Sequence, residues 1–402
     1  MLIVKKFGGS SVADTEKIFN VARRCIEDYE KGHDVVVVLS AMGKTTDGLI
    51  AKAHEITPKP SKRELDMLLA TGEQVSVALM AMAFQSLGVQ AVSLNAAQVA
   101  MHTTAAYGMA KLKRIDTQRI KHELESRKIV VVTGFQGINK YDDLMTLGRG
   151  GSDTTAVALA AALHADACEI YTDVEGVYTA DPRIVPNARK LSEVSYDEML
   201  EFASLGAKVL HNRSVEMAKK YQVQLVVLSS LTRAPGTVVR EGVKMEKMLV
   251  SGVAVDKNTA RISVMGVKDE PGIAFRVFNL LARAGINVDI IIQSVGREST
   301  KDISFTVAKT DLDEAMTLLN ENKELLTAGR VECNENVAKI SIIGAGMTSN
   351  PGVAARMFEA LYSAHINIRM IATSEIRITV LIDEAEAERA MRVVHDAFAL
   401  GE

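Results

Sequence analysis

Short runs of β-branched and other apolar residues recur along the first part of the chain. Five of them predict strands, at Leu2–Val4, Val35–Leu39, Ile129–Thr133, Glu169–Thr172 and Leu225–Leu228. Runs of continuous apolar residues are typical of parallel strands that are covered on both faces. Between them, residues 16–32 and 62–88 have the pattern of helices, the first with a glycine at its end. The pattern predicts an α/β fold, a three-layer αβα sandwich around a mainly parallel sheet.

Small polar residues follow directly on several of these strands. They are found in KFGGSS (6–11), VVVVLSAMGKTTD (35–47), VVVTGFQG (130–137) and IYTDVEG (170–176). In an open α/β sheet, ligands lie off the carboxyl ends of the strands. We therefore expect the functional site of this domain at that edge of the sheet.

The second part of the chain contains an internal duplication. Residues 271–291 and 351–371 share Pro, Gly, Ala, Arg, Phe, Leu, Ile and Asn at matching places, and 262–266 (ISVMG) matches 340–344 (ISIIG). A period near 80 residues is too long for a solenoid repeat and indicates a duplicated small domain. Each copy has the order of a ferredoxin-like βαββαβ module. The alternative is a pair of structural modules that only make dimers.

These patterns predict four regions. A catalytic domain covers residues 1–235, and the Pro235–Gly236 turn begins a linker and joining strand over 236–261. The first repeat module covers 262–335 and the second covers 336–402. We also expect residues 249–256 (LVSGVAVD) to pair with the second module, which would make the first an insertion.

Composition excludes several classes of function. The 402 residues carry a net charge of −3 without a dense Lys/Arg block, so we expect no nucleic-acid partner. No uninterrupted apolar run is long enough to cross a bilayer, and the N-terminus has too few apolar residues for a signal peptide. Cys25, Cys168 and Cys333 match neither a disulfide framework nor a metal cluster, which indicates a reducing cytoplasm. The eight histidines show no ligand spacing, so any catalytic metal is expected to be Mg²⁺ held by oxygens and nucleotide phosphates.

Candidate chemistry is concentrated in GRGGSDTT, residues 148–155, at the start of an alanine-rich helix. A helix N-terminus and an arginine both receive anions, so Arg149 between glycines indicates a carboxylate or phosphate site. Asp153 can hold a lysine or a substrate ammonium, although Ser152 or Asp153 also serves as a helix cap. Lys6 before Gly8 and Gly9 is a weaker signal, because KFGGSS matches neither a Walker P-loop nor a GxGxxG fingerprint.

Other polar residues have two readings each. Ser40, Thr45 and Thr46 follow a buried strand, and each taken alone is better explained as a helix cap or turn former than as a ligand contact. Glu73 stands in an otherwise apolar helical stretch, on a solvated face or against a ligand.

Taken together, KFGGSSV, SAMGKTTD, TGE, GRGGSDTTA and YTDVEGVYTADPR, followed by paired ACT-like repeats, resemble the monofunctional aspartokinases of the amino-acid kinase family. The resemblance covers essentially the whole chain. It implies ATP-dependent phosphorylation of the side-chain carboxylate of L-aspartate to 4-phospho-L-aspartate, the first step toward lysine, threonine and methionine. An aspartate carboxylate is already ionised at pH 7, so no general base is needed.

The resemblance also implies roles for matching residues. Catalytic roles fall to Lys6, Asp153 and Lys208. Aspartate would contact Ser40, Thr46, Glu73, Arg149, Gly150, Gly151 and Ser152. ATP, with Mg²⁺ bridging its phosphates and no dedicated protein cage, would contact Lys6, Phe7, Gly8, Gly9, Thr172, Asp173, Tyr178, Asp181, Arg183 and Lys208.

For the repeat modules, the resemblance implies binding of lysine, threonine or both as feedback inhibitors. The matching positions are Asp269, Gly272, Ala274, Asn287, Val288, Asp289 and Gln293 in the first repeat and Asn367, Ile368 and Ser374 in the second. Pairing of ACT modules implies a homo-oligomer. Met245 and Met248, just before the repeats, leave room for a separately translated regulatory subunit.

Two other classes stay open at this point. One is another amino-acid kinase, acting on glutamate, acetylglutamate, carbamate or UMP, whose members generally lack the double ACT tail. The other is a catalytically silent amino-acid sensor, against which the charges of Lys6, Arg149, Asp153 and Lys208 argue. A fused homoserine dehydrogenase is not expected, because no dinucleotide-binding domain follows the second repeat.

Overall fold

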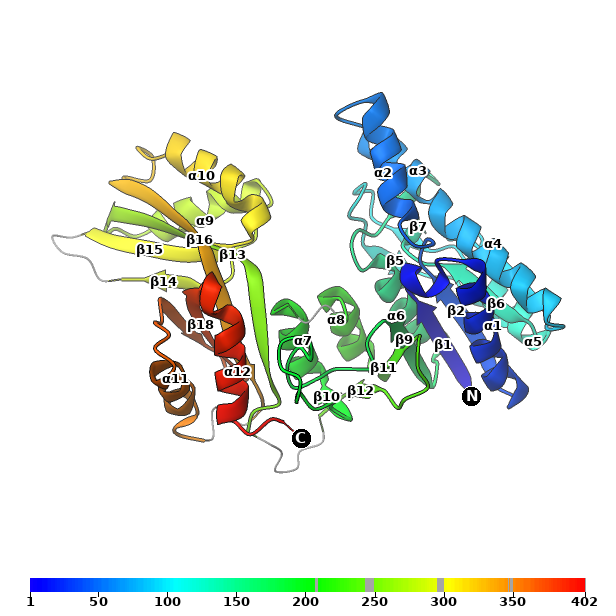
Figure 1. Ribbon diagram of the computed structural model, residues 1–402. Coiled ribbons are helices and arrows are strands. Elements are labelled where there is room, and N and C mark those ends of the chain that lie inside the picture. Colours follow the sequence, from blue (N-terminus) through cyan, green and yellow to red (C-terminus); the bar gives the residue numbers. More distant parts are fainter. Residues whose placement is uncertain (207–208, 243–248, 295–299, 346, 348–349, 402) are drawn as a thin grey trace. The chain divides into compact units, whose positions relative to one another are not determined.

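The computed structural model describes residues 1–206, 209–242, 249–294, 300–345, 347 and 350–401. The chain divides into two compact units. The first comprises Met1–Val177, Lys190–Ala203 and Lys208–Lys244, and the second comprises Tyr178–Arg189, Ser204–Ala207 and Met245–Glu402. Each unit has its own sheet and core (Figure 1).

An eight-stranded sheet forms the centre of the first unit, in the order β10-β12-β11-β9-β1-β2-β6-β3. Its neighbouring strands are parallel except for the β11–β12 pair. The bounds are β1 Leu2–Phe7, β2 Asp34–Leu39, β3 Ala91–Leu94, β6 Ile129–Thr133, β9 Ala167–Thr172, β10 Glu193–Ser195, β11 Leu225–Ser229 and β12 Thr237–Arg240. The five predicted strands are β1, β2, β6, β9 and β11, and the mainly parallel sheet is confirmed.

Helices cover both faces of this sheet, as the apolar runs predict. On one face, α1 and α4 pack on odd-numbered residues such as Phe7, Val37 and Val131. On the other face, α6 lies against β1, β2 and β9, with α8 beside it (Figure 1). The helix bounds are α1 Thr15–Glu30, α2 Thr45–Ile56, α3 Lys62–Leu69, α4 Thr71–Ser86, α5 Gln118–Glu125, α6 Gly151–Leu163, α7 Tyr196–Ser204 and α8 Asn212–Tyr221.

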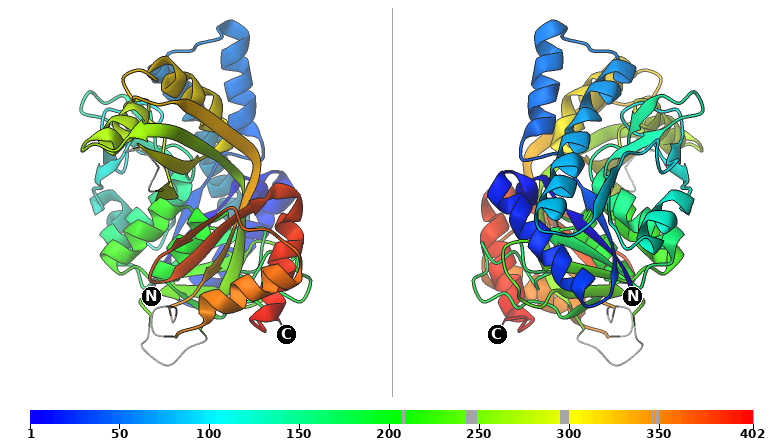
Figure 2. Two further views of the ribbon diagram at one scale, coloured as in Figure 1. Left: turned by 90° about the vertical axis from the view of Figure 1, so that its left-hand side faces the viewer. Right: turned by 90° about the vertical axis from the view of Figure 1, so that its right-hand side faces the viewer.

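Smaller elements complete the first unit. A four-stranded sheet has the order β5-β4-β7-β8, with β4 His102–Thr103, β5 Leu112–Arg114, β7 Gln136–Ile138 and β8 Leu144–Thr146. A 3-10 turn, Gly9–Val12, follows β1. Helix α2 has no buried residue and stands clear of the sheet (Figure 2).

The stretch Lys62–Ser86 contains α3 and α4 and passes the length and hydropathy test for a membrane span among the described residues. Of its most apolar window, 56% is buried within the structure. Val77, Met80 and Phe84 of this stretch pack into the core on β2 and β6. A core helix of a globular domain meets the same test.

One boundary differs from the sequence prediction. Residues Thr237–Arg240, which we assigned to the linker, form strand β12 of the first sheet. The chain reverses between Ser229 and Thr237, and β12 pairs antiparallel with β11 in the register Val226↔Val238. Gly236 lies so close to the Val227 carbonyl that a Cβ would not fit. The segment is therefore a hairpin connection of seven residues, 230–236, within the sheet rather than an exit from it.

The second unit is built on one six-stranded sheet, in the order β14-β15-β13-β16-β18-β17. Its elements are β13 Gly252–Lys268, α9 Ile273–Arg283, β14 Ile291–Gln293, β15 Thr300–Val307, α10 Leu312–Glu321, β16 Arg330–Ile343, α11 Val353–Ser363, β17 Met370–Thr373, β18 Arg377–Asp383 and α12 Ala387–Ala397. The 3-10 turns Lys309–Asp311 and Glu384–Glu386 precede α10 and α12.

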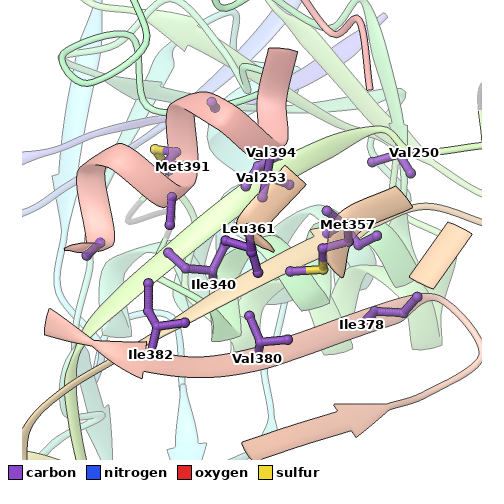
Figure 3. Packing of buried hydrophobic residues seen from close by; sticks show 14 of the residues in the cluster. Val250, Val253, Ile340, Met357, Leu361, Ile378, Val380, Ile382, Met391 and Val394 are labelled. Atoms are coloured by element: carbon purple, nitrogen blue, oxygen red, sulfur yellow. The ribbon is translucent and has the colours of Figure 1, made fainter. Parts of the chain in front are cut away.

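The two long central strands are shared by both repeat modules. Residues 252–256 of β13 pair with 339–343 of β16, and residues 261–265 pair with 330–334 (Figure 1; from two further sides in Figure 2). The first half of β13 thus lies in the second module, which confirms the expected pairing of 249–256. Figure 3 shows Val250 and Val253 packed with Ile340, Met357 and Val394. The two βαββαβ repeats are confirmed, and they form one continuous sheet.

Candidate active site

Polar loops of the first unit converge at the carboxyl edge of its sheet. Strands β1, β2, β6 and β9 are parallel neighbours, so their ends at Phe7, Leu39, Thr133 and Thr172 lie side by side. Backbone hydrogen bonds join these ends, from Ser40 N to the Phe7 carbonyl (3.2 Å) and from Gly134 N to the Leu39 carbonyl (2.9 Å). The loops that follow these strands therefore lie next to one another at the edge of the sheet where the site was predicted.

Lys6 is the only charged side chain that β1 directs to the α6 face among its six residues. Its Nζ lies 2.6 Å from Asp153 Oδ1, in the first turn of α6. The two side chains are 12% and 13% exposed, so the pair is sheltered but open to a ligand. Asp153 thus restrains the Lys6 ammonium at the edge of the sheet.

The glycines after Lys6 permit close contact between two loops. A Cβ on Gly9 would collide with the Ala41 carbonyl, and Gly43 N donates to the Gly9 carbonyl at 2.9 Å. The loop after β1 therefore packs directly on the loop after β2 that carries Ser40. Backbone approach of this kind is what glycine allows.

Glu73 is buried beside the same loop. Its side chain is 3% exposed, and Oε1 accepts a hydrogen bond from Ala41 N at 3.0 Å. The second oxygen, Oε2, is buried and has no hydrogen-bond partner among the described residues. Burial raises the pKa of Glu73 to about 7. A buried carboxylate oxygen without a donor is an unmet hydrogen-bond acceptor, which a cationic ligand group would satisfy.

The GRGG loop leads into the N-terminus of α6. Gly148 and Gly150 have φ of +78° and +67°, in the left-handed region, and Gly150 is the N-cap of α6. Gly151 packs between Phe135 and Leu147. The first N–H groups of α6 are thereby presented at the edge of the sheet, as an anion site requires.

Arg149 stands between these two glycines and is exposed, whereas Ser152 is buried against Gly134. The structure thus brings together Lys6, Gly8, Gly9, Ser40, Glu73, Gly150–Ser152 and Asp153, all at one edge. Thr46 lies half-buried in the first turn of α2.

Comparison with known proteins agrees with this geometry. Residues 1–229 match the amino acid kinase family, and residues 262–322 and 340–398 match an ACT domain. The aspartokinase of Bacillus sp. strain MGA3 is 50% identical over 400 residues, which cover 99% of this chain and 97% of that protein. The chain belongs to the aspartokinases.

Solved structures support the same assignment. Escherichia coli aspartokinase III in complex with aspartate and ADP, in its R-state, is 28% identical with a TM-score of 0.84, covering 99% of both chains. The same enzyme in complex with lysine and aspartate, in its T-state, has a TM-score of 0.78, with 28% identity and 99% of both chains covered. The protein is therefore an aspartate kinase, a phosphotransferase with a carboxyl group as acceptor.

In this aspartokinase, the predicted nucleotide residues fall into three groups. Thr172 ends β9, and its hydroxyl donates to Asp173 Oδ1 at 3.0 Å. The Phe7 side chain is fully buried and stacks on Tyr171 with ring centroids 4.3 Å apart, so only its backbone is open to a ligand. Lys208 lies outside the described residues.

The third group, Tyr178, Asp181 and Arg183, belongs to the second compact unit. Arg183 contacts both carboxylate oxygens of Asp181, at 3.0 and 2.7 Å, and this contact lowers the pKa of Asp181. Ala180 and Val185 of the same segment pack in the core of the second module. The local sequence held no signal for this, because the segment packs on residues far along the chain, such as Val253, Ile340 and Val394.

Of the predicted effector residues, Asp269, Gly272 and Ala274 lie at the turn and first residues of α9, whereas the others follow the ends of α9 and α11, in or beside β14 and β17. Gly272 and Gly352 cap α9 and α11 with φ of +95° and +97°. Asp269 is paired with Lys301 at 3.0 Å, and Asp289 with Lys339 at 2.6 Å. Asn287, Gln293, Asn367 and Ser374 are exposed, and Gly272 is exposed at its turn, whereas Ala274, Val288 and Ile368 are half-buried. Both carboxylates suited to an effector ammonium thus have a lysine partner in the structure.

The end of the VVVTGFQG strand contacts the start of α6, which its sequence did not predict. Gly134 approaches Ser152 so closely that a Cβ would not fit, and Phe135 N donates a hydrogen bond to the Thr155 hydroxyl oxygen at 3.2 Å. The end of β6 therefore seats the start of α6. The glycine directly after an apolar strand was the available signal.

Proposed function

We propose that this chain transfers the γ-phosphoryl group of ATP to the side-chain carboxylate of L-aspartate, giving 4-phospho-L-aspartate and ADP. The observation that carries the proposal is the Lys6–Asp153 pair, in which the lysine ammonium lies 2.6 Å from a carboxylate in the first turn of α6. The complex of E. coli aspartokinase III with aspartate and ADP supports this choice of reactants.

In the proposed reaction, an oxygen of the substrate carboxylate attacks the γ-phosphorus and the bond to the bridging oxygen of ADP breaks. The attacking group is already ionised, so no proton is removed. The obstacle is repulsion between two anions, and the protein acts by positioning and charge neutralisation. Lys6 would contact the transferring phosphoryl group, with Gly8 and Gly9 donating backbone N–H groups and Asp153 orienting the ammonium.

Recognition of aspartate would divide between its charged groups. Glu73 Oε2, buried and without a described donor, suits the substrate ammonium. Arg149 would bind a substrate carboxylate, with Gly150, Gly151 and Ser152 forming the cradle at the start of α6. Ser40 and Thr46 would complete the contacts from the loop after β2.

The nucleotide would lie along the Thr172–Asp173 end of β9. Tyr178, Asp181, Arg183, Lys208 and the backbone of Phe7 remain proposed contacts. Mg²⁺ would bridge the phosphates. Among the described residues no group of three or more His, Cys, Asp or Glu side chains comes together to hold a metal ion.

Feedback inhibition by lysine, threonine or both would act through the ACT modules. The lysine-bound T-state of E. coli aspartokinase III supports an amino-acid effector. We propose the sites named above, around Asp269 and Asp289, with loop N–H groups after each Pro–Gly turn receiving the effector carboxylate. A homo-oligomer through ACT pairing, a separate regulatory subunit and a cytoplasmic location also remain proposals.

An assay of acyl-phosphate formation tests the reaction. The full chain is incubated with ATP, Mg²⁺ and hydroxylamine, and hydroxamate and ADP are measured with aspartate, glutamate, acetylglutamate, carbamate or UMP as acceptor. We expect hydroxamate and ADP to form in equal amounts when aspartate is the acceptor, and neither product to form with the other acceptors. ADP formation with another acceptor, and none with aspartate, would overturn the proposal.

A further inference from the structure

We propose that Arg213 and Asp66 are positioning residues that fix the aspartate-binding loop 147–150. The inference rests on the proposed function, in which Arg149 of this loop binds a substrate carboxylate. Neither residue was singled out by its sequence. Both bind the chain where the loop begins, at residues 146–147, and tie it to residues 108–110.

Arg213 binds two separate backbone segments from the first turn of α8. Its Nη1 donates to the Leu147 carbonyl and its Nη2 to the Ala110 carbonyl, each at 2.7 Å. Leu147 is the residue at which the GRGG loop begins. A cation in the first turn of a helix is unfavourable to the helix dipole, so this arginine does not stabilise α8 itself. Burial lowers the pKa of Arg213, in keeping with a guanidinium turned inward.

Asp66 of α3 binds the same two segments, 108–110 and 146–147, but its carboxylate accepts hydrogen bonds where Arg213 donates them. Its Oδ2 accepts from Gly108 N at 2.9 Å and from Thr146 N at 3.0 Å, and its Oδ1 accepts from the Thr146 hydroxyl at 2.6 Å. The side chain is 1% exposed. Ala110 N donates directly to the Thr146 carbonyl at 3.0 Å. A buried acceptor and an arginine donor thus tie residues 108–110 to residues 146–147.

The far end of the loop is held by the same helix start. His211, the N-cap of α8, packs on Gly150 so closely that a Cβ at Gly150 would collide with its ring. Arg213 and His211 therefore fix Leu147 and Gly150, one on each side of Arg149. Two glycines give the loop wide backbone freedom, and restraint at both ends limits where the Arg149 guanidinium can lie.

The test is a comparison of steady-state kinetics in the full-length enzyme. For Arg213→Ala we expect the KM for aspartate to rise about tenfold or more, with the KM for ATP changed less than about threefold, because misplacement of a binding group is costly. For Arg213→Lys, the KM for aspartate should lie between those of the wild-type enzyme and Arg213→Ala. An ammonium can donate to one of the two carbonyls but cannot hold both. Asp66→Asn should raise the KM for aspartate in the same selective way.

Arg24→Ala is the matched control. Arg24 also donates to two backbone carbonyls, those of Ser229 (2.7 Å) and Thr232 (2.6 Å), and is 6% exposed, but it lies away from the loop. It should lower thermal stability while the KM for aspartate stays within about twofold. An equal rise in the KM for aspartate with Arg24→Ala would overturn the specific role of Arg213.

A double-mutant cycle separates this inference from the proposed function. If Arg213 acts through Arg149, Arg213→Ala should change the KM for aspartate less than about twofold in an Arg149→Ala background. A tenfold effect in both backgrounds would overturn the inference and leave Arg213 a general structural residue. An Arg149→Ala enzyme with unchanged KM would instead overturn the proposed aspartate site. A raised KM in Arg149→Ala with none in Arg213→Ala would overturn the positioning role alone.

Discussion

Lys5 and Lys6 are neighbours in sequence, and the pleat of β1 directs them to opposite faces of the sheet. Lys6 meets Asp153 on the α6 face. Lys5 is 1% exposed on the α1 face and lies 2.6 Å from both Asp28 and Glu169. Its pKa is raised by Glu169 and its other partners, which outweigh the effect of burial. Lys6 therefore lies in the candidate site, and Lys5 is buried in the core.

This pair gives a residue-scale prediction. Lys6→Ala should lower kcat by about a thousandfold, because several kcal/mol of transition-state stabilisation are lost, while aspartate binding changes little. Lys5→Met should leave the KM values near normal but destabilise the fold by about 3 kcal/mol, since two carboxylates lose their buried partner. Steady-state kinetics and thermal unfolding of both variants check this. Near-normal turnover in Lys6→Ala would show that its assigned role is wrong.

Glu73 gives a second residue-scale prediction, on pH. Its folded pKa of about 7 lies above the ordinary value of 4.5, so the folded state binds the extra proton and this group costs stability as pH rises from about 4.5 to about 7. Glu73→Gln should therefore stabilise the fold at pH 8, by up to about 3 kcal/mol, and much less at pH 5.

The same titration should appear in substrate binding. Only ionised Glu73 attracts the substrate ammonium, so the KM for aspartate should fall as pH rises through about 7 in the wild-type enzyme. In Glu73→Gln the KM should be high and insensitive to pH over that range. Equal pH profiles for the two enzymes would rule out this contact.

At the scale of elements, the N-terminus of α6 is held in place by contacts with residues that follow β6 and β8 and with the N-cap of α8. Gly151 fits between Phe135 and Leu147, Ser152 lies against Gly134, and Gly150 lies against His211. The helix is buried on nearly all sides, which its alanine-rich sequence allows. The precise place of its N-terminus thus depends on β6, β8 and α8 together.

Gly150→Ala tests this seating. The substitution adds left-handed backbone strain of about 1 kcal/mol and a collision with His211, so we expect kcat/KM for aspartate to fall at least about tenfold. Gly88→Ala is the control, because Gly88 has a φ of +82° and open space around it. Gly88→Ala should lower the stability of the fold through the same backbone strain, while kcat/KM for aspartate stays unchanged. Equal kinetics in the two variants would contradict the seating of α6.

Much of the element plan follows from the sequence alone. Apolar runs located β1, β2, β6, β9 and β11, and the repeated Pro–Gly segments located α9 and α11, because these signals are local. The hairpin strand β12 and the place of residues 178–189 in the second unit were not predicted, since both depend on pairing with distant segments. For the candidate site, the strand-end residues and Asp153 could be named from the sequence, whereas Asp66 and Arg213 bind mainly backbone atoms and leave no sequence pattern.

At the scale of the whole molecule, the chain passes between the two units several times. Residues Tyr178–Arg189 leave the first unit after β9 and return before β10. Within the second unit, the Thr179 hydroxyl meets His395 Nε2 of α12 at 3.0 Å and the Leu400 carbonyl at 3.2 Å. The segment that carries Asp181 and Arg183 is therefore held by the core of the second ACT module. A rearrangement of that module would therefore change the positions of Asp181 and Arg183, because they belong to a segment packed in its core.

We therefore expect millimolar lysine, threonine or both to inhibit the enzyme by favouring a less active arrangement. Asp289→Ala should weaken that inhibition, because it removes a carboxylate at the proposed effector site and its contact with Lys339. Initial rates with each amino acid and with the mixture check this. Activity that is flat across all three conditions would refute feedback control by these two amino acids.

In the proposed reaction, one edge of the first sheet holds both anions, with Lys6 at the point of phosphoryl transfer. A crystal structure of the enzyme with aspartate, Mg²⁺ and a non-hydrolysable ATP analogue measures this directly. We expect the substrate ammonium within hydrogen-bond distance of Glu73 Oε2, a substrate carboxylate on Arg149, and the γ-phosphate on Lys6. Aspartate or nucleotide bound away from these three side chains would contradict the account.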